Sequence, residues 1–186
     1  MSTRFFDTYP ELVTDKFRLR QPTLEDVEPL AAIYFQSVFG RYIIGDPPGG
    51  VAKMHEKVAR DLEAMKRGEV FRWVLCERGQ EVPLGNLGLF NWNQHNRSAE
   101  IGYVISMSLW GQGVMKELMS AVLRFGFEDI GLHRVEAHVD PSNGASLRVL
   151  TRAGFQQEGV LRESFAVTGG YRDTVVLGML EQDWQR

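Results

Sequence analysis

The chain has 186 residues, a formal net charge of −3 at pH 7 and a hydrophobic fraction of 44 %. This length predicts a single domain over residues 1–186, and the apolar content is sufficient for a packed core. Lys and Arg form no long run, which gives little support to a nucleic-acid surface, and neither a membrane-spanning run nor a signal peptide is recognisable. We therefore expect a cytoplasmic protein that binds neither nucleic acid nor membranes.

The first half of the chain predicts short strands around two helices. Thr23 can cap the first helix, and Gly40 ends it. The single cysteine, Cys76, falls in an apolar strand and is expected in the core. Gly85 and Gly88, inside the last strand of this half, predict a bulge or close packing. In chain order, we expect an irregular segment over residues 1–15, a strand over 16–20, a helix over about 23–39, a loop rich in Pro and Gly over 41–50, a helix over 51–66 and a hairpin of strands 71–77 and 82–92.

Residues 97–116 pass from a strand through a glycine turn into a helix. Ile101, Tyr103 and Ile105 alternate with smaller residues, as in a partly buried strand, before the turn Gly111-Gln112-Gly113. Glycines let the backbone approach a ligand closely, and the first turn of a helix offers unpaired N–H groups and a positive dipole end. This combination is typical of a phosphate-binding site.

A second stretch, residues 139–146, follows another strand and opens a short helix. It contains Asn143 and Ser146 three residues apart. In chain order, the second half is expected to contain the strand before residue 106, a helix to about 130, a strand over 134–139, a helix closed by residues 153–155, and an antiparallel pair of strands over 155–162 and 172–180.

Together these stretches resemble the GCN5-related N-acetyltransferase (GNAT) superfamily. The glycine turn looks like the family's acetyl-CoA pyrophosphate loop, and Asn143 and Ser146 match its Asn-x-x-Ser helix. The nearer resemblance is to the RimJ/RimL-type ribosomal-protein N-terminal acetyltransferases, through Ala-Glu-Ile-Gly-Tyr at 99–103, Trp-Gly-x-Gly at 110–113 and Glu117. The likeness covers nearly the whole chain.

The order of these elements predicts an α/β (α+β) fold, in which a mixed, mostly antiparallel sheet of seven strands is flanked by about four helices. The resemblance adds the details of the cofactor cleft. The fourth strand, which ends near Ile105, would be bulged and would splay from the fifth, so that a cofactor cleft opens between them. The pantetheine arm of acetyl-CoA would lie in this cleft like an extra strand.

The resemblance also implies which residues hold acetyl-CoA as the co-substrate. The backbone N–H groups from Gln112 to Lys116 would bind its pyrophosphate, although Met115 replaces the family's final Gly or Ala. Asn143 would fix the pantetheine arm or the splayed strand, and it could also cap its helix. The implied cofactor-binding residues are Ile105, Gln112, Gly113, Val114, Met115, Lys116, Asn143 and Ser146.

The resemblance implies three catalytic tasks besides holding acetyl-CoA. Glu100 is the first candidate for the base that neutralises the amine, with His138 as the second; each also has an ordinary structural role open to it. A backbone N–H near residues 104–106 would stabilise the oxyanion. The family's tyrosine acid is absent, since Leu150 stands at its position, so Ser146 would assist the leaving thiolate. Glu163 could steer a cationic amine, and the scattered His residues and single Cys predict no metal site.

We therefore expect direct transfer of an acetyl group from acetyl-CoA to a primary amine. The RimJ/RimL likeness favours the α-amine of a protein N-terminus as the acceptor. A small-molecule amine, such as an aminoglycoside, a polyamine or an amino acid, stays open within the enzyme class. Outside it, Met115 and the missing tyrosine leave room for a catalytically silent acyl-CoA-binding sensor. The protein could be a monomer or a homodimer.

Overall fold

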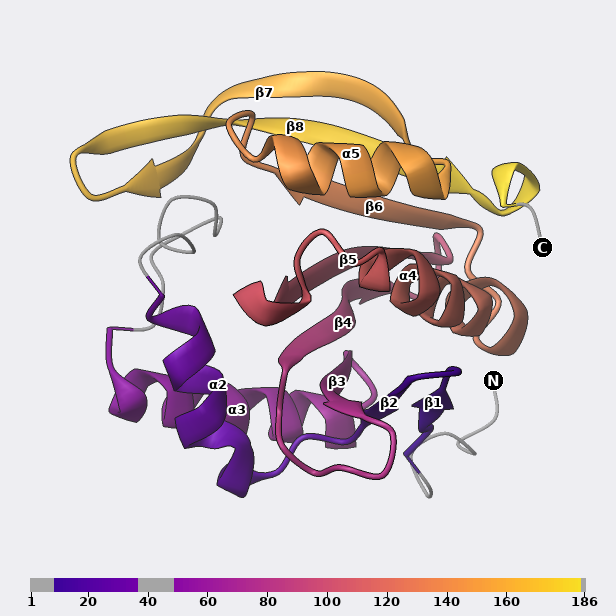
Figure 1. Ribbon diagram of the computed structural model, residues 1–186. Coiled ribbons are helices and arrows are strands. Elements are labelled where there is room, and N and C mark those ends of the chain that lie inside the picture. Colours follow the sequence, from indigo (N-terminus) through magenta and orange to yellow (C-terminus); the bar gives the residue numbers. More distant parts are fainter. Residues whose placement is uncertain (1–8, 37–48, 185–186) are drawn as a thin grey trace.

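The computed structural model describes residues 9–36 and 49–184 and contains a single eight-stranded sheet among them (Figure 1). Its strand order is β1-β2-β3-β4-β5-β6-β8-β7, and every neighbouring pair is antiparallel except β5 and β6. The strands are β1 (Leu12–Val13), β2 (Phe17–Arg20), β3 (Phe71–Glu77), β4 (Gly85–Asn93), β5 (Ser98–Ile105), β6 (Arg134–Val139), β7 (Gln156–Val167) and β8 (Gly170–Leu180).

The expected α+β architecture is confirmed, with eight strands where seven were predicted. The additional strand, β1, lies in a segment that we expected to be irregular. It has only two residues, Leu12 and Val13, which pair with Leu19 and Arg18 of β2. A strand of this length carries no periodic pattern, so the sequence could not indicate it.

Four α-helices surround the sheet in the part of the chain that the structure describes. They are α2 (Val27–Tyr34), α3 (Val51–Lys66), α4 (Val114–Arg124) and α5 (Gly144–Ala153). α3 has the predicted bounds, whereas α2 follows a 3₁₀ turn at Leu24–Asp26 and ends at Tyr34, before the predicted end. The predicted stop at Gly40 and most of the loop over 41–50 lie outside the described residues.

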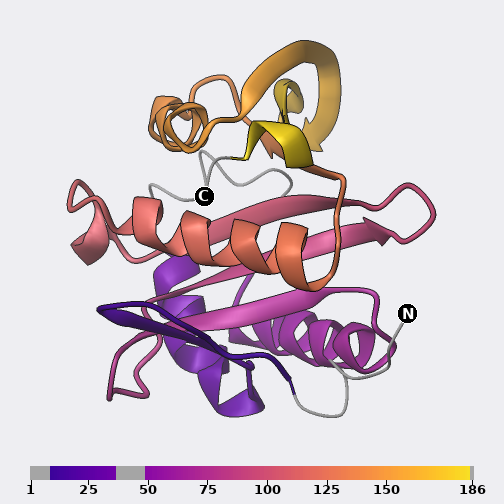
Figure 2. The same cartoon turned by 90° about the vertical axis from the view of Figure 1, so that its right-hand side faces the viewer.

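The sheet separates two hydrophobic clusters. On one face, α2 and α3 pack with Val74 and Cys76, and Val104 of β5 joins them. On the other face, α4 and α5 pack against the larger cluster, and Figure 2 shows α4 lying along the sheet. Cys76 is fully buried, as predicted, and burial raises the pKa of its thiol. Alternate residues of β5 therefore face different helix pairs.

The pairing between β5 and β6 is short, and this opens the sheet. Only Ser98, Ala99 and Glu100 of β5 pair with β6, opposite Arg134, Val135 and Glu136. Beyond these positions, β5 pairs with β4 alone and β6 with β8 alone. The two strands thus diverge from Glu100 onward, which confirms the expected splay.

The bulge lies on a different strand from the one expected. Between the pairs Phe90–Glu100 and Asn93–Ser98, β4 has one more residue than β5. The extra residue therefore belongs to β4, where Asn91 adopts a left-handed φ of 51°. Close packing at the predicted glycines is confirmed, because a Cβ on Gly85 would lie 2.3 Å from the Val104 carbonyl oxygen.

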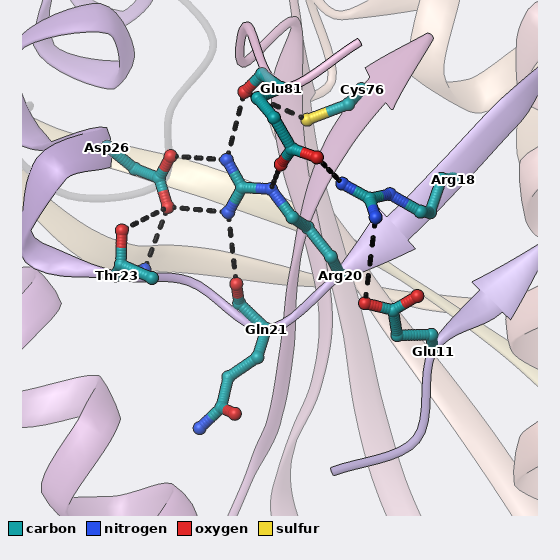
Figure 3. Close-up of polar contacts among 8 residues, drawn as sticks. All are labelled: Glu11, Arg18, Arg20, Gln21, Thr23, Asp26, Cys76 and Glu81. Carbon is teal, nitrogen blue, oxygen red and sulfur yellow. Dashed lines mark hydrogen bonds and ion pairs between the residues drawn. The ribbon is translucent and has the colours of Figure 1, made fainter. Parts of the chain in front are cut away.

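A buried ion-pair network fastens the N-terminal strands to the helical layer below the sheet (Figure 3). The Asp26 carboxylate is 3 % exposed and accepts two hydrogen bonds from the Arg20 guanidinium, at 2.6 and 2.8 Å. Glu81 pairs with both Arg18 and Arg20. Burial acts to raise the pKa of Asp26, but the hydrogen bonds from Arg20 and Thr23 outweigh it and hold this pKa below its ordinary value. Because a buried carboxylate is stable only when paired, this contact fixes the start of α2 against β2.

Candidate active site

A cleft of about 1590 Å³ lies where β5 and β6 diverge. Residues of β5, β6, α4 and α5 line it on one side of the sheet, and residues of α3, β3 and β4 line it on the other. Of the residues expected to bind the cofactor, six line the cleft, namely Ile105, Gly113, Met115, Lys116, Asn143 and Ser146. Gln112 and Val114 do not line it, so any part they have would be through the backbone.

The glycine turn sets the start of α4 at the edge of this cleft. Gly111 and Gly113 have φ values of 74° and 75°, which favour glycine, and Gly113 is the N-cap residue. Two side chains fasten the turn: the Trp110 indole donates to the Ile105 carbonyl at 3.3 Å, and the Gln112 amide donates to the Ser108 carbonyl at 2.6 Å. The turn therefore holds Gly113, Met115 and Lys116 at the edge of the cleft, and the start of a helix offers unpaired N–H groups there.

Two details differ from the expected pyrophosphate loop. The Lys116 N–H donates to the Gly113 carbonyl at 3.0 Å, which removes it from the set of unpaired donors. The Met115 side chain is only 7 % exposed and belongs to the large cluster, so it points away from the mouth of the cleft. The family-like Glu117 accepts the Lys16 N–H at 3.0 Å and so ties α4 to the start of β2.

Ser146 is paired with a residue to which the sequence had assigned no catalytic role. The hydroxyl oxygens of Ser146 and Tyr103 are 2.7 Å apart. Burial raises the pKa of Tyr103 to about 12, so the phenol stays protonated near neutral pH. Asn143 caps α5, because its side-chain oxygen accepts the Ser146 N–H at 3.0 Å. The sequence signals for Tyr103 were its place at the end of the motif at 99–103 and its alternation with Ile101 and Ile105, which puts it on the α4 side of β5; neither signal assigned it a catalytic part.

The candidate bases lie on the other side of the sheet. Glu100 is the last β5 residue to pair with β6, and its carboxylate accepts the Asn91 amide at 2.9 Å. His138 also lines the cleft, 3.8 Å from the Glu136 carboxylate. Since Glu100 alternates with Ile101 and Tyr103, the sheet stands between Glu100 and Ser146 except where β5 and β6 diverge.

Glu163 is not brought to the cleft. Its side chain is exposed, its φ is 49°, and its N–H donates to the Asp173 carboxylate at 2.8 Å. The predicted site thus gathers Glu100, His138 and Ser146 and leaves Glu163 in the β7–β8 hairpin. Sequence reasoning missed several basic residues that line the cleft, which are Lys53, Lys57, Arg60, Arg72, Arg148 and Arg152.

A sheet opened at one parallel strand pair, with a helix N-terminus at the opening, is the arrangement of the acetyltransferase class that the sequence resembles. A family model described as an acetyltransferase (GNAT) domain matches residues 16–156. The chain therefore belongs to the GNAT acetyltransferase family, and it is an N-acetyltransferase.

Individual relatives agree with this assignment. The "Uncharacterized N-acetyltransferase YoaA" of Bacillus subtilis is 32 % identical over 93 % of this chain and 98 % of its own. The ribosomal protein uS5-alanine N-acetyltransferase of Escherichia coli is 28 % identical over 66 % of this chain and 63 % of its own. Among solved structures, Mycobacterium smegmatis RimJ in complex with CoA-disulfide has a TM-score of 0.83 at 24 % identity, covering 95 % of this chain and 88 % of its own.

Two further findings concern the described residues alone. None of their helices is long and apolar enough to cross a membrane. Within the same ranges, no three His, Cys, Asp or Glu side chains gather as a set of metal ligands.

Proposed function

We propose that this protein transfers the acetyl group of acetyl-CoA to the α-amine of a protein N-terminus. The observation that carries the proposal is the divergence of β5 and β6 after Glu100, with the start of α4 on one side of the sheet and Glu100 on the other. A cofactor can then enter from the α4 side while an amine enters from the α3 side. The likeness to the uS5-alanine enzyme supports a protein N-terminus as the acceptor.

Acetyl-CoA would be held mainly by backbone and by positive charge. The N–H groups from Gln112 to Met115, at the start of α4, would bind its pyrophosphate. Arg148 and Arg152 of α5 line the same side of the cleft, where they would attract the cofactor's remaining negative charge. The pantetheine arm would lie along the β5 edge beyond Glu100, which has no strand partner on that side.

Of the backbone N–H groups expected near residues 104–106, that of Ile105 is best placed to stabilise the oxyanion. The Ser106 N–H donates to the Leu84 carbonyl at 2.7 Å, so it is directed toward β4 and is occupied. Successive N–H groups of a strand point to opposite sides. The Ile105 N–H is therefore directed toward the open cleft, where it would stabilise the tetrahedral oxyanion.

In this mechanism, the free amine nitrogen attacks the thioester carbonyl carbon, and the C–S bond breaks. Glu100 takes the proton that the amine loses, directly or through water. The sulfur leaves as a thiolate that accepts a hydrogen bond from the Ser146 hydroxyl. Tyr103 in turn donates to Ser146, so the pair supplies the group that the family's tyrosine would have provided.

Calorimetric titration followed by an acceptor panel tests the proposal. We expect micromolar binding of acetyl-CoA and no comparable binding of ATP. Release of free CoA thiol should then follow with N-terminal peptides and be slower with polyamines, aminoglycosides and free amino acids. Binding of acetyl-CoA without thiol release on any amine would instead identify a silent acyl-CoA sensor, and a fast small-molecule amine would replace the protein acceptor.

A further inference from the structure

We propose that the acceptor carries a carboxylate close to its reactive amine, and that Arg72 and Lys57 bind it. The inference rests on the proposed function, because it concerns the acceptor side of the same cleft. For a protein acceptor, the matching substrate is an N-terminus with Asp or Glu at its first or second position. A free amino acid has the same chemistry and is separated from it by the experiment below.

The Arg72 side chain is built into the sheet so that it reaches the cleft. Arg72 of β3 pairs with Gly88 of β4, which pairs with Gly102 of β5. A Cβ on Gly88 would lie 2.6 Å from the Arg72 Cδ atom, so only glycine lets the side chain cross β4. The guanidinium then stacks on Phe90, 4.5 Å from its ring centre. Phe90 itself covers Gly102, at the diverging part of β5.

The guanidinium is largely removed from water and forms no hydrogen bond with any residue that the structure describes. The Arg72 side chain is 20 % exposed, and its buried Nε atom makes no hydrogen bond. Its nearest carboxylate within the described ranges is that of Asp61, at 3.7 Å from Nε, which is an ion pair without a hydrogen bond. A guanidinium has five N–H donors, and leaving them unpaired in a partly buried place costs free energy. A bound carboxylate would satisfy two of them at once.

Among the described residues, the cations near Arg72 outnumber the carboxylates that pair with them. Asp61 is also bonded to the Lys57 ammonium at 2.6 Å, so one carboxylate serves two cations. Burial and the nearby Arg72 charge lower the pKa of Lys57. Arg60, which lines the same part of the cleft, makes no ion pair with any described residue. Glu100, which lines the same cleft, hydrogen-bonds the Asn91 amide and makes no ion pair with Arg72 or Lys57.

The position suits an anion a few bonds from the reacting nitrogen. Neighbouring strands are about 4.8 Å apart, so β3 and β5 are separated by about 10 Å, and the extended Arg72 side chain spans much of that distance. Its guanidinium therefore lies above β4, about one strand spacing from β5, whose open edge is where the amine would react. A carboxylate on the first or second residue of a peptide can reach this place.

The experiment compares three peptides that differ only at the second position, which is glutamate, glutamine or lysine. Free glutamate and aspartate are assayed beside them. The measured quantity is kcat/KM from CoA thiol release, for the unaltered protein and for Arg72→Gln, Arg72→Lys and Lys57→Gln. Arg67→Gln is the matched control, since Arg67 pairs with Glu69 on the exposed end of α3, away from the cleft. Thermal unfolding verifies that each variant is folded.

We expect the glutamate peptide to be preferred over the glutamine peptide by about 10- to 100-fold. Arg72→Gln should remove this preference while changing kcat/KM for the glutamine peptide by less than about 3-fold, and Arg72→Lys should retain part of it. Equal rates on the three peptides, or a preference that survives Arg72→Gln, would overturn the inference and leave the proposed function standing. Faster reaction of free amino acids than of any peptide would uphold the carboxylate site and overturn the protein acceptor.

Discussion

A hydrogen bond between the Tyr103 and Ser146 side chains joins β5 to α5 at the cleft. Their hydroxyl oxygens are 2.7 Å apart, and a protonated phenol leaves Ser146 free to donate toward the leaving sulfur. The proposed chemistry does not require a strong acid here, because a hydrogen bond to a charged thiolate is itself worth about 1.5–3 kcal/mol. Tyr103 is therefore a positioning residue, and Ser146 is the catalytic one.

Replacing Tyr103 by phenylalanine tests this assignment. The variant keeps the buried ring and loses the hydroxyl, so we expect kcat to fall about 10-fold while the Kd for acetyl-CoA stays within about 2-fold. Steady-state thiol release and calorimetry measure the two quantities. Tyr171→Phe is the control, since Tyr171 is 67 % exposed on β8 and does not line the cleft. An unchanged kcat in Tyr103→Phe would remove the pair from the mechanism.

The turn before α4 requires glycine because of its backbone conformation and not because a side chain would lack room. A Cβ added to Gly113 would have no neighbour within 4 Å, but its φ of 75° strains any side chain. We expect Gly113→Ala to lose about 1–2 kcal/mol of stability and to lower Tm by about 4 °C. Binding of acetyl-CoA should weaken as well, because the first N–H groups of α4 shift.

Gly159→Ala is the matched control for that variant. Gly159 lies in β7 with no neighbour within 4 Å of an added Cβ and without a positive φ. Its substitution should leave both Tm and acetyl-CoA affinity unchanged. Equal Tm values for Gly113→Ala and Gly159→Ala would show that the left-handed turn is not maintained in solution.

The ion pair between Arg20 and Asp26 makes part of the stability pH-dependent. The pKa of Asp26 is lower in the folded chain than the value of about 3.9 expected when it is unfolded. Its contribution is therefore present above pH 4 and is lost as the pH falls through the folded pKa. We expect Asp26→Asn to lower Tm at pH 7 by about 5–10 °C.

The role of the Asp26 charge can be tested by measuring Tm over a range of pH. The difference in Tm between the unaltered protein and Asp26→Asn should shrink as the pH is lowered below 4, because the unfolded carboxyl then takes up a proton more readily than the folded one, whose pKa is lower. Differential scanning calorimetry from pH 7 to pH 3 measures it. A difference that stays constant over this range would mean that the charge of Asp26 does not stabilise the fold.

Across the molecule, periodic segments could be predicted and contacts between distant segments could not. α3, β3 and β6 have the bounds that apolar periodicity indicated. β4 begins at Gly85 rather than at residue 82, since Pro83 has no N–H to donate to a ladder. α4 ends at Arg124, and the chain continues as a π-helical turn over Phe125–Asp129.

In the candidate site, too, local motifs could be predicted and contacts between distant residues could not. Motifs in order indicated the family, the splayed strands and the place of Glu100 and Ser146. Tyr103 and Ser146 lie 43 residues apart in the chain, and no local pattern links them. Arg72 looked like an ordinary strand residue, because its path to the cleft depends on a glycine in the neighbouring strand. Both contacts depend on how distant segments are aligned in the folded sheet, and this alignment cannot be read from a single sequence.

The central claim is that an acetyl group is transferred in the cleft where β5 and β6 diverge. Mass spectrometry of a glutamate-bearing N-terminal peptide incubated with acetyl-CoA tests it most directly, with the unaltered protein, Glu100→Gln and Glu136→Gln compared. Glu136 pairs opposite Glu100 but does not line the cleft, so it is the matched control.

We predict a single acetyl group on the peptide's α-amine, formed about 100-fold more slowly by Glu100→Gln and at an unchanged rate by Glu136→Gln. Binding of acetyl-CoA should be equal in all three proteins. An unmodified peptide despite bound acetyl-CoA, or a full rate in Glu100→Gln, would contradict the account.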